Sequence, residues 1–293
     1  MNVQLRCISC ILNRGYMQIQ ESTDDTALQF KVLSEVLRFL NEEFTPTANP
    51  ADLGTKRDRL IRKMTNAYDV YEQKKKLSNQ KALEALSVAQ DIVSQESSPE
   101  LRFRRACLSA IVGNIMEFDL PDNPFKFSDL KCLIQQAEDD LAIDDISKIY
   151  QKAKNSKQIL YLTDNAGEIA LDTLLVKELK NLGAEVIVAV KAGPVLNDAL
   201  LEDAKAVGMD KVADRVITTG ADSVGLFTSE CSKEFLDLYR SVDFVIAKGM
   251  GHAETLTGVE LPVSHALLLR SKCSTVAKHF GVQTGKNIAK LLI

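Results

Sequence analysis

The stretch that decides the fold class is Val186-Ile187-Val188-Ala189-Val190, an unbroken run of apolar, mostly β-branched residues. Such runs are typical of strands that are covered on both faces, as in parallel sheets. Similar runs recur after residue 156, separated by segments of helical pattern, and the alternation predicts parallel strands joined by crossover helices in a Rossmann-like, doubly wound α/β sheet. The predicted strands are Gln158–Thr163, Glu185–Val190, Arg215–Thr218, Asp243–Ala247 and Cys273–Ala277.

The first half of the chain has a helical pattern instead. One apolar stripe follows helical spacing and consists of Leu33, Val36, Leu37, Leu40 and Phe44. Pro46 and Pro50 interrupt this pattern. Further helices are expected at 56–76, 79–95 and 99–118, with two short ones within 127–155. We therefore expect a helical domain at 1–155 and a Rossmann-like domain at 156–293.

Composition restricts the classes of partner and location. The 293 residues are 45% hydrophobic and 26% charged, with a formal net charge of −4. This balance argues against a nucleic-acid partner, because phosphate neutralisation usually requires a basic face. No apolar run approaches the ~20 residues of a membrane helix, and no signal-peptide pattern opens the sequence. The six cysteines are mostly scattered. We expect a cytoplasmic protein with reduced thiols and no membrane contact.

Polar residues that follow the predicted strands are the candidates for a site, because open α/β sheets bind ligands at the carboxyl ends of their strands. Asp164 and Asn165 follow the first strand and can present two hard oxygen ligands to a divalent cation. The helix expected to start near Ala166 would add free N–H groups that suit a phosphate. An Asx turn with a helix N-cap explains the same residues equally well. Glu168 fits either catalysis or compensation of the helix dipole.

Two other strand ends carry weaker signals. After the second strand, Pro194 suits a first helical turn, and Asp198 would lie about one turn into that helix. After the third strand, the segment with Gly220 and Ser223 can wrap an oxyanion with backbone amides. A solvated Asp and an ordinary loop are the simpler interpretations of these two segments.

The fourth strand end carries a lysine and a glycine-rich turn, Lys248-Gly249-Met250-Gly251, followed by His252 and Glu254. Lys248 can neutralise a phosphate as a point charge, and the glycines let the backbone approach a ligand closely. His252 is interpreted as an extra ligand, a proton-transfer group or an ordinary surface or supporting residue. Acids, an amide and a lysine at one sheet edge are suited to a metal-bound phosphate.

Several familiar motifs are absent. The sequence has no Gly-x-Gly-x-x-Gly after the first strand, no P-loop and no Gly-x-Ser-x-Gly. A nucleotide cofactor and a serine nucleophile are therefore disfavoured. Cys7 and Cys10 lie one helical turn apart, but one such pair cannot complete a four-ligand zinc site. Buried thiols and a metal or redox role both remain open for them.

Taken together, these segments resemble the damage-control phosphatase family, and they look most like its archaeal and bacterial branch. The resemblance rests on Asp164-Asn165-Ala166-Gly167-Glu168, on Asn197-Asp198 and on Asp243 through Gly251. In the helical half it adds Cys7-x-x-Cys10, Asp69-x-Tyr71 with Lys75, and Gly113-Asn114 followed by Glu117. His252 stands where this family commonly has Asn, and Glu117 where it commonly has Asp.

The resemblance implies a hydrolase of small phosphorylated metabolites, such as sugar phosphates or damaged cofactor precursors, that uses Mn, Co, Ni or Mg. By matching position, the metal ligands would be Asp164, Asn165 and Asp198, and Lys248 would hold the phosphate beneath a helical roof. Substrate contacts are expected from Asn114, Glu168, Asn197, Ser223, Lys248 and His252.

We expect direct attack by a metal-activated water molecule, with Asp164 and Lys248 as the catalytic residues. Asp164 as a nucleophile is the alternative, but the Asp-x-Asp pair of the haloacid-dehalogenase type is missing here. Two other classes of function are alternatives. A non-catalytic regulator would bind phosphometabolites without turnover. A methyltransferase would need a glycine-rich first turn and an acid at the end of the second strand, where Lys191 stands.

Overall fold

The structure is a computed structural model that describes residues 1–113 and 130–293. Its sheet has seven strands in the order β1-β7-β6-β5-β2-β3-β4. Their bounds are β1 Leu141–Asp144, β2 Gln158–Leu162, β3 Glu185–Val190, β4 Arg215–Thr218, β5 Phe244–Lys248, β6 His265–Arg270 and β7 Asn287–Leu292. Only β6 and β7 pair antiparallel among these neighbours. The predicted class, a doubly wound and mostly parallel α/β sheet, is confirmed.

One predicted strand was wrong and three strands were missed. The segment Cys273–Ala277 lies at the start of helix α13 (Ser274–Phe280), where Cys273 accepts a hydrogen bond from Val276 N. A short apolar run does not distinguish a strand from a buried helix, so capping decided this case. Strand β6 was missed because its sequence, HALLLR, has strong helix formers. Strands β1 and β7 were missed as well.

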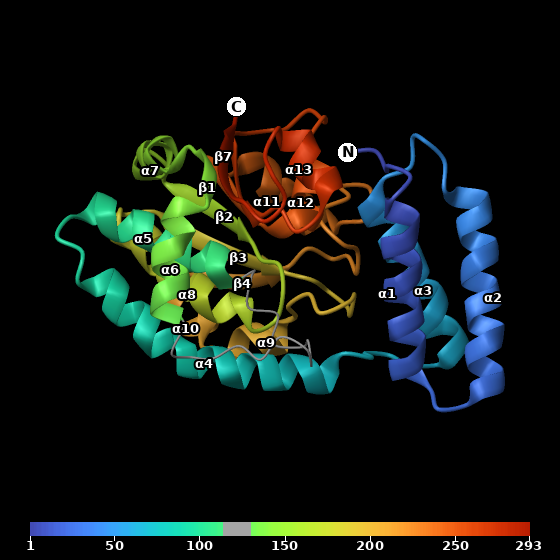
Figure 1. Ribbon diagram of the computed structural model, residues 1–293. Helices are drawn as coiled ribbons and strands as arrows, with labels where there is room; N and C mark the ends of the chain where they lie inside the picture. Colours follow the sequence, from blue (N-terminus) through green and yellow to red (C-terminus); the bar gives the residue numbers. More distant parts are fainter. Residues whose placement is uncertain (114–129) are drawn as a thin grey trace.

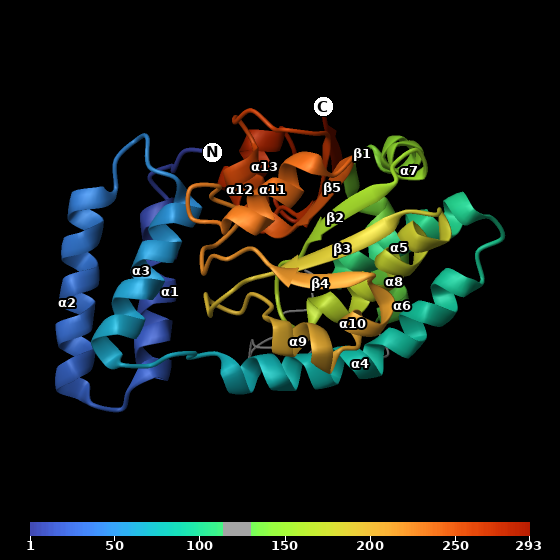
Figure 2. The same ribbon diagram turned by 180° about the vertical axis from the view of Figure 1, so that it is seen from behind.

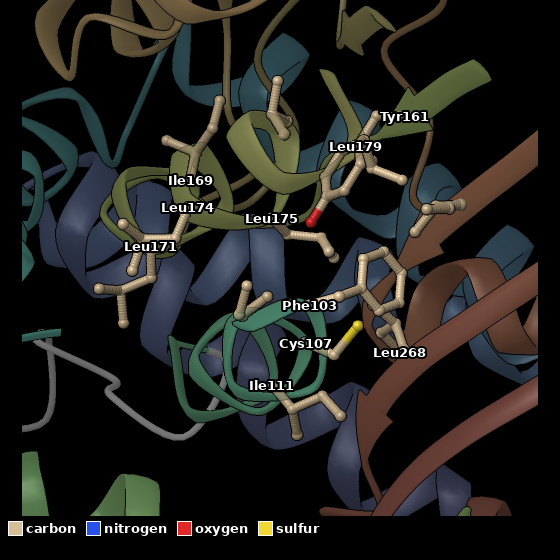
Figure 3. Close-up of a cluster of buried hydrophobic side chains, with 14 of the residues drawn as sticks. Phe103, Cys107, Ile111, Tyr161, Ile169, Leu171, Leu174, Leu175, Leu179 and Leu268 are labelled. Carbon is tan, nitrogen blue, oxygen red and sulfur yellow. The ribbon is translucent and has the colours of Figure 1, made fainter. Parts of the chain in front are cut away.

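One face of the sheet is covered by helices from both halves of the chain (Figure 1). These are α4 (Glu72–Ser94), α5 (Pro99–Gly113), α6 (Leu130–Asp139), α7 (Ile146–Lys154), α8 (Glu168–Asn181) and the short α9 (Leu201–Ala206) and α10 (Met209–Val212). Figure 3 shows how Phe103, Cys107 and Ile111 of α5 pack beside Leu175 of α8 and Tyr161 of β2. This core is fully buried and fixes α8, whose first turn belongs to the candidate site.

The other face is covered by α11 (Lys233–Ser241), α12 (Gly249–Leu256) and α13. Successive residues of each strand alternate between the two cores. In β2, Tyr161 belongs to the core beneath α4–α8, while Leu160 and Leu162 belong to the core beneath α11–α13. The central strands are therefore apolar on both faces, as the run Val186–Val190 predicted.

The first three helices form a separate bundle with its own small core (Figures 1 and 2). They are α1 (Cys7–Ser22), α2 (Thr26–Glu43) and α3 (Pro50–Thr65). The helix predicted at 56–76 was wrong, because Asn49 caps α3 and Pro50 opens it. Asn66 then ends α3 in the left-handed conformation at φ 56°. Of the two prolines that interrupt the pattern, Pro46 lies in a turn and Pro50 opens a helix.

The bundle α1–α3 lies against loops at the carboxyl edge of the sheet. Thr55 accepts a hydrogen bond from Val224 N (3.0 Å), and Asn49 donates one to Glu254 O (2.9 Å). Helices α4–α7 and strand β1 instead belong to the sheet domain, since β1 pairs with β7. The expected division at 155/156 therefore does not follow the packing. None of the described helices is both long and apolar enough to cross a membrane.

The strand order places a topological switch point at one edge of the sheet. From β2 the chain moves to β3 and β4 on one side, and it then returns to β5 on the other side of β2. Ligands of doubly wound folds bind at such a switch point, outside the carboxyl ends of the strands. Here those ends are the ends of β2, β3 and β5.

Candidate active site

The residues predicted after β2 and β3 lie side by side at the carboxyl edge. Asn165 and Asp198 form an isolated antiparallel β-bridge. Around it, Ala166 N donates to Asn197 O (2.9 Å) and Ala199 N donates to Asp164 O (2.8 Å). The two segments that carry the three predicted metal ligands are thus joined by backbone hydrogen bonds.

The local structure around Asp198 differs from the expectation. Asp198 lies in a turn rather than one turn into a helix, and α9 begins only at Leu201. Leu196 has φ 47°, a left-handed conformation that breaks any helix begun at Pro194. The turn is held from the bundle, because Asp58 accepts a hydrogen bond from Leu196 N (3.4 Å). This turn is what brings Asp198 back toward the end of β2.

The amide of Asn165 is oriented by two carboxylates. Its Nδ2 donates to Asp164 Oδ2 and to Glu168 Oε2, each at 3.0 Å. Because both acceptors attract the NH2 group, Oδ1 of Asn165 faces the other way, where it can serve as an oxygen ligand. Helix α8 begins at Glu168, two residues later than expected, with Gly167 at φ 78° before it.

Lys248 was expected to bind the phosphate, but the structure places its ammonium group among acceptors inside the protein. It is fully buried, and its Nζ donates to Ala110 O (2.9 Å), Glu168 Oε1 (2.6 Å) and Asp172 Oδ1 (2.9 Å). An ammonium group has three N–H bonds, and these three acceptors use all of them. A phosphate oxygen would have to displace one. In this arrangement Lys248 instead fixes Glu168, and through it the amide of Asn165.

The start of helix α12, directly after Lys248, lets the backbone approach Asp164 closely. Gly249 has φ +80°, and a Cβ atom built on it would collide with Asp164 Oδ2. Only glycine fits this position, both for the backbone conformation and for the space. The glycine-rich segment expected to be a turn is instead the first turn of α12, and its Gly249 lies against the carboxylate of Asp164.

The cluster is rich in buried acids. Burial, followed by the charges of Glu168 and Asp198, raises the pKa of Asp164 well above its usual value. Burial also raises the pKa of Asp198 to about 6, although Lys191 opposes the rise. Burial also raises the pKa of Asp172 to about 6, although the charge of Lys248 opposes the rise. Like charges held together in a low dielectric are destabilising unless a cation offsets them.

A second buried lysine was not among the predicted site residues. Lys191, which is 3% exposed at the end of β3, places Nζ 3.7 Å from Asp198 Oδ2. Within the described residues, the structure gives its Nζ one hydrogen bond, to Gly225 O. A charged residue at the end of a buried strand is a sequence signal that could have identified Lys191 as a site residue. From the sequence, Lys191 served only as evidence against a methyltransferase.

The remaining predicted substrate contacts differ in what the structure says of them. His252 is buried, and its Nδ1 lies 2.7 Å from Lys248 O while Nε2 has no hydrogen-bond partner in the described part of the chain. Burial, then the charge of Lys191, lowers the pKa of His252 to about 3, so the ring is neutral. Ser223 is buried in the loop after β4, and Asn197 lies in the turn before Asp198, where its backbone oxygen accepts from Ala166 N. Asn114 lies outside the described residues.

The cysteine pair takes no part in this cluster. Cys7 is buried with its Sγ 3.3 Å from Thr275 Oγ1, whereas Cys10 is exposed. Across residues 1–113 and 130–293, no three His, Cys, Asp or Glu side chains are grouped to hold a metal ion. The predicted set at the carboxyl edge differs in kind, since one of its three ligands is an amide.

Comparisons with known proteins show which family this chain belongs to. Residues 3–288 match the damage-control phosphatase ARMT1-like domain. The chain belongs to the damage-control phosphatase family. A protein named damage-control phosphatase from Archaeoglobus fulgidus is 32% identical over 100% of both chains. Another from Pyrococcus horikoshii is 32% identical and covers 97% of this chain and 96% of its own length.

The fold agrees with this membership. The crystal structure of a DUF89 family protein from Pyrococcus horikoshii is similar to this chain with a TM-score of 0.87 and 29% sequence identity. The match covers 99% of this chain and 98% of that one. The expected family is therefore confirmed, and phosphatase, the expected class of activity, is the activity named for these relatives of the damage-control phosphatase family.

Proposed function

We propose that this chain is a metal-dependent phosphatase that hydrolyses small phosphorylated metabolites at the carboxyl edge of its sheet. The cation would be Mn, Co, Ni or Mg, held by Asp164, Asn165 and Asp198. The observation that carries the proposal is the β-bridge between Asn165 and Asp198, with Ala199 N bonded to Asp164 O at 2.8 Å. It brings all three ligand residues together from two strand ends.

The donor set fits a divalent cation. Two carboxylates and one amide oxygen are hard ligands, the type that Mg2+ and similar cations prefer. Asp198 is buried and Asp164 is half-buried, and the two interact as like charges. Lys248 bonds Glu168 and Asp172, and the charges of Lys248, Lys272 and Lys191 oppose the raised pKa values of Asp164 and Asp198 without cancelling the rise. A cation between them would relieve the repulsion.

When bound, the cation would polarise a phosphoryl oxygen and lower the pKa of an attacking water molecule. The chain's own residues orient the parts. Glu168 and Asp164 hold the amide of Asn165, and Lys248 holds Glu168. We assign Lys191 rather than Lys248 to the phosphate, because Lys191 lies beside Asp198 and has one hydrogen bond among the described residues.

Asp164 is poorly placed to act as a nucleophile. One of its oxygens accepts from Asn165 Nδ2, and that same oxygen packs against Gly249. In-line attack would then fall to Oδ1, the oxygen that the proposed metal site uses as a ligand. Attack by water therefore suits this arrangement better than an aspartyl-phosphate intermediate.

The test is phosphate release from a panel of sugar phosphates with Mn, Co, Ni or Mg, and with chelator. Chelator should abolish release, and Asp164→Ala should lower it by about a thousandfold or more while the unfolding temperature is kept or raised. The stability is expected to hold because a buried like charge is removed. Retained activity in Asp164→Ala would contradict the proposal, and a trapped phosphoenzyme on Asp164 would contradict attack by water. Tight ligand binding without turnover under every metal would favour a regulator instead.

A further inference from the structure

Helix α4 presents two buried polar side chains, Lys75 and Asn79, one turn apart and without a place in the proposed chemistry. They are 1% and 3% exposed, respectively. Helix α4 packs against both α8 and α9, the helices that follow the two ligand-bearing segments. Buried polar groups in such a position need a reason, because their burial is costly unless every hydrogen bond is made.

Asn79 is hydrogen-bonded to both sides of the candidate metal site. Its Oδ1 accepts from Gly167 N (2.7 Å), two residues after Asn165. Its Nδ2 donates to Asp203 Oδ1 (2.7 Å). The other oxygen of Asp203 accepts from Leu200 N (2.9 Å), two residues after Asp198. One side chain and one carboxylate thus join the segment of Asp164 and Asn165 to the segment of Asp198.

The partners determine which way the Asn79 amide faces. A backbone N–H can only donate and an ionised carboxylate can only accept, so Oδ1 must face Gly167 and Nδ2 must face Asp203. Lys75 supports the carboxylate, with Nζ 3.6 Å from Asp203 Oδ2 and 2.6 Å from Asp69 Oδ2. An isosteric change at either position 79 or position 203 would therefore break one specific bond.

We infer that Asn79 is a positioning residue that sets the separation between the two halves of the metal-ligand set, acting through Gly167 and Asp203. The inference rests on the proposed metal site and adds to it the device that aligns its ligands. Residues that orient metal ligands from behind change metal affinity by about 10- to 100-fold when they are substituted.

The experiment is a swap measured with Co2+ as the probe. Asn79→Asp retains the acceptor for Gly167 N but places a carboxylate against Asp203, and Asp203→Asn removes the same bond from the other side. The double variant Asn79→Asp/Asp203→Asn restores it, because the new amide at 203 can donate to the new carboxylate at 79 and still accept from Leu200 N. Net charge changes by one in each single variant and is unchanged in the double variant.

Each single variant should bind Co2+ at least about tenfold more weakly, with an altered visible absorption spectrum that reports changed ligand geometry. The double variant should recover the wild-type spectrum and an affinity within about threefold. Asn181→Asp is the matched control, because Asn181 also donates to a carboxylate, Glu178, but at the far end of α8. It should leave Co2+ binding unchanged. If Asn79→Asp folds poorly by circular dichroism, Asp203→Asn provides the same comparison.

The outcomes separate the two proposals. Single variants with wild-type Co2+ affinity and spectrum would overturn the inference while leaving the phosphatase assignment in place. The inference also fails if the single variants lose affinity and the swap does not restore it, since the effect would then not pass through this bond. A wild-type protein that binds no Co2+ and releases no phosphate would overturn the proposed function itself.

Discussion

The two edges of one sheet treat the same residue type in opposite ways. At the amino edge, Asp243 precedes β5 and accepts from Lys157 N (2.8 Å) and Gln158 N (2.9 Å). These hydrogen bonds lower its pKa. At the carboxyl edge, the half-buried Asp164 lies near the buried Asp198 and Glu168, and the pKa values of Asp164 and Asp198 are raised.

The reason lies in the backbone groups that each edge offers. Strand starts offer free N–H groups, so an aspartate there can accept hydrogen bonds from the backbone. Asp214, before β4, repeats the pattern. Its partial burial raises its pKa, but hydrogen bonds from Lys180 and Val186 N lower it overall. Strand ends offer carbonyl groups, which cannot satisfy a carboxylate. Acids gathered there are costly, and such costs are typical of functional sites.

The largest difference in phosphate release should be between variants of Asp198 and Asp243. Asp198→Asn should lower metal-dependent phosphate release about a hundredfold or more, because the proposed site loses a charged ligand. Asp243→Asn should retain activity and lower the free energy of unfolding by about 1 kcal/mol, since two backbone donors lose a charged acceptor. Steady-state phosphate release and urea unfolding measure the two effects. If both variants lost activity to the same degree, the contrast between the edges would be wrong.

A smaller difference should separate Lys248 from Lys180. Lys248→Met should lower the free energy of unfolding by about 3–5 kcal/mol, because Glu168 and Asp172 would stay buried without their cation. Lys180→Met removes an exposed partner of Asp214 and should cost less than about 1 kcal/mol.

Both Lys248→Met and Lys180→Met can be measured by urea unfolding with chelator present, so that metal binding does not contribute. Similar losses in the two variants would mean that burial at the carboxyl edge has been overestimated.

The strands of the sheet were predicted from the sequence more accurately than the helices around it. The β-branched strands β3 and β4 were predicted with their observed bounds, because such runs suit strands covered on both faces. The sequence HALLLR of β6 carries no such signal, and its pairing with β5 and β7 decides it. At Cys273–Ala277 the apolar run was ambiguous as well, and a local cap on α13 made it a helix start.

For the site, the carboxyl ends of the predicted strands singled out Asp164 and Asn165 and gave Asp198 only as a weak candidate, and the family resemblance grouped the three as ligands. The partners of Lys248 were beyond such reasoning. Its acceptors come from α5 and α8, and only the packing of those helices shows that its N–H groups are used. Asn79 was missed for the same reason, since it lies 88 residues from Gly167.

The weakest effect concerns pH and tests whether the contrast between the edges extends to β6. His265 opens β6 at the amino edge, where its Nδ1 lies 2.8 Å from Val263 O and its Nε2 lies 2.8 Å from Tyr239 Oη. Burial lowers its pKa to about 4. The unfolded chain therefore binds a proton near pH 6.5 that the folded chain does not, so this group destabilises the fold as pH falls from about 6.5 to 4. Asp172 acts in the opposite sense, because its raised pKa of about 6 means that the folded state takes up its proton first.

His265→Gln should remove the pH-dependent loss from this group, since the amide can still accept from Tyr239. From pH 7.5 to 4.5, we expect the free energy of unfolding of the wild type to fall by about 2–3 kcal/mol more than that of the variant, as urea unfolding with chelator can measure. His279→Gln is the control. His279 is only partly buried, and its pKa is lowered without a large shift, so this substitution should alter the pH dependence of the free energy of unfolding less than His265→Gln does. A difference that stays constant with pH would show that His265 is charged in the fold. The amino edge would then hold a buried charge as the carboxyl edge does, and the contrast between the edges would not extend to β6.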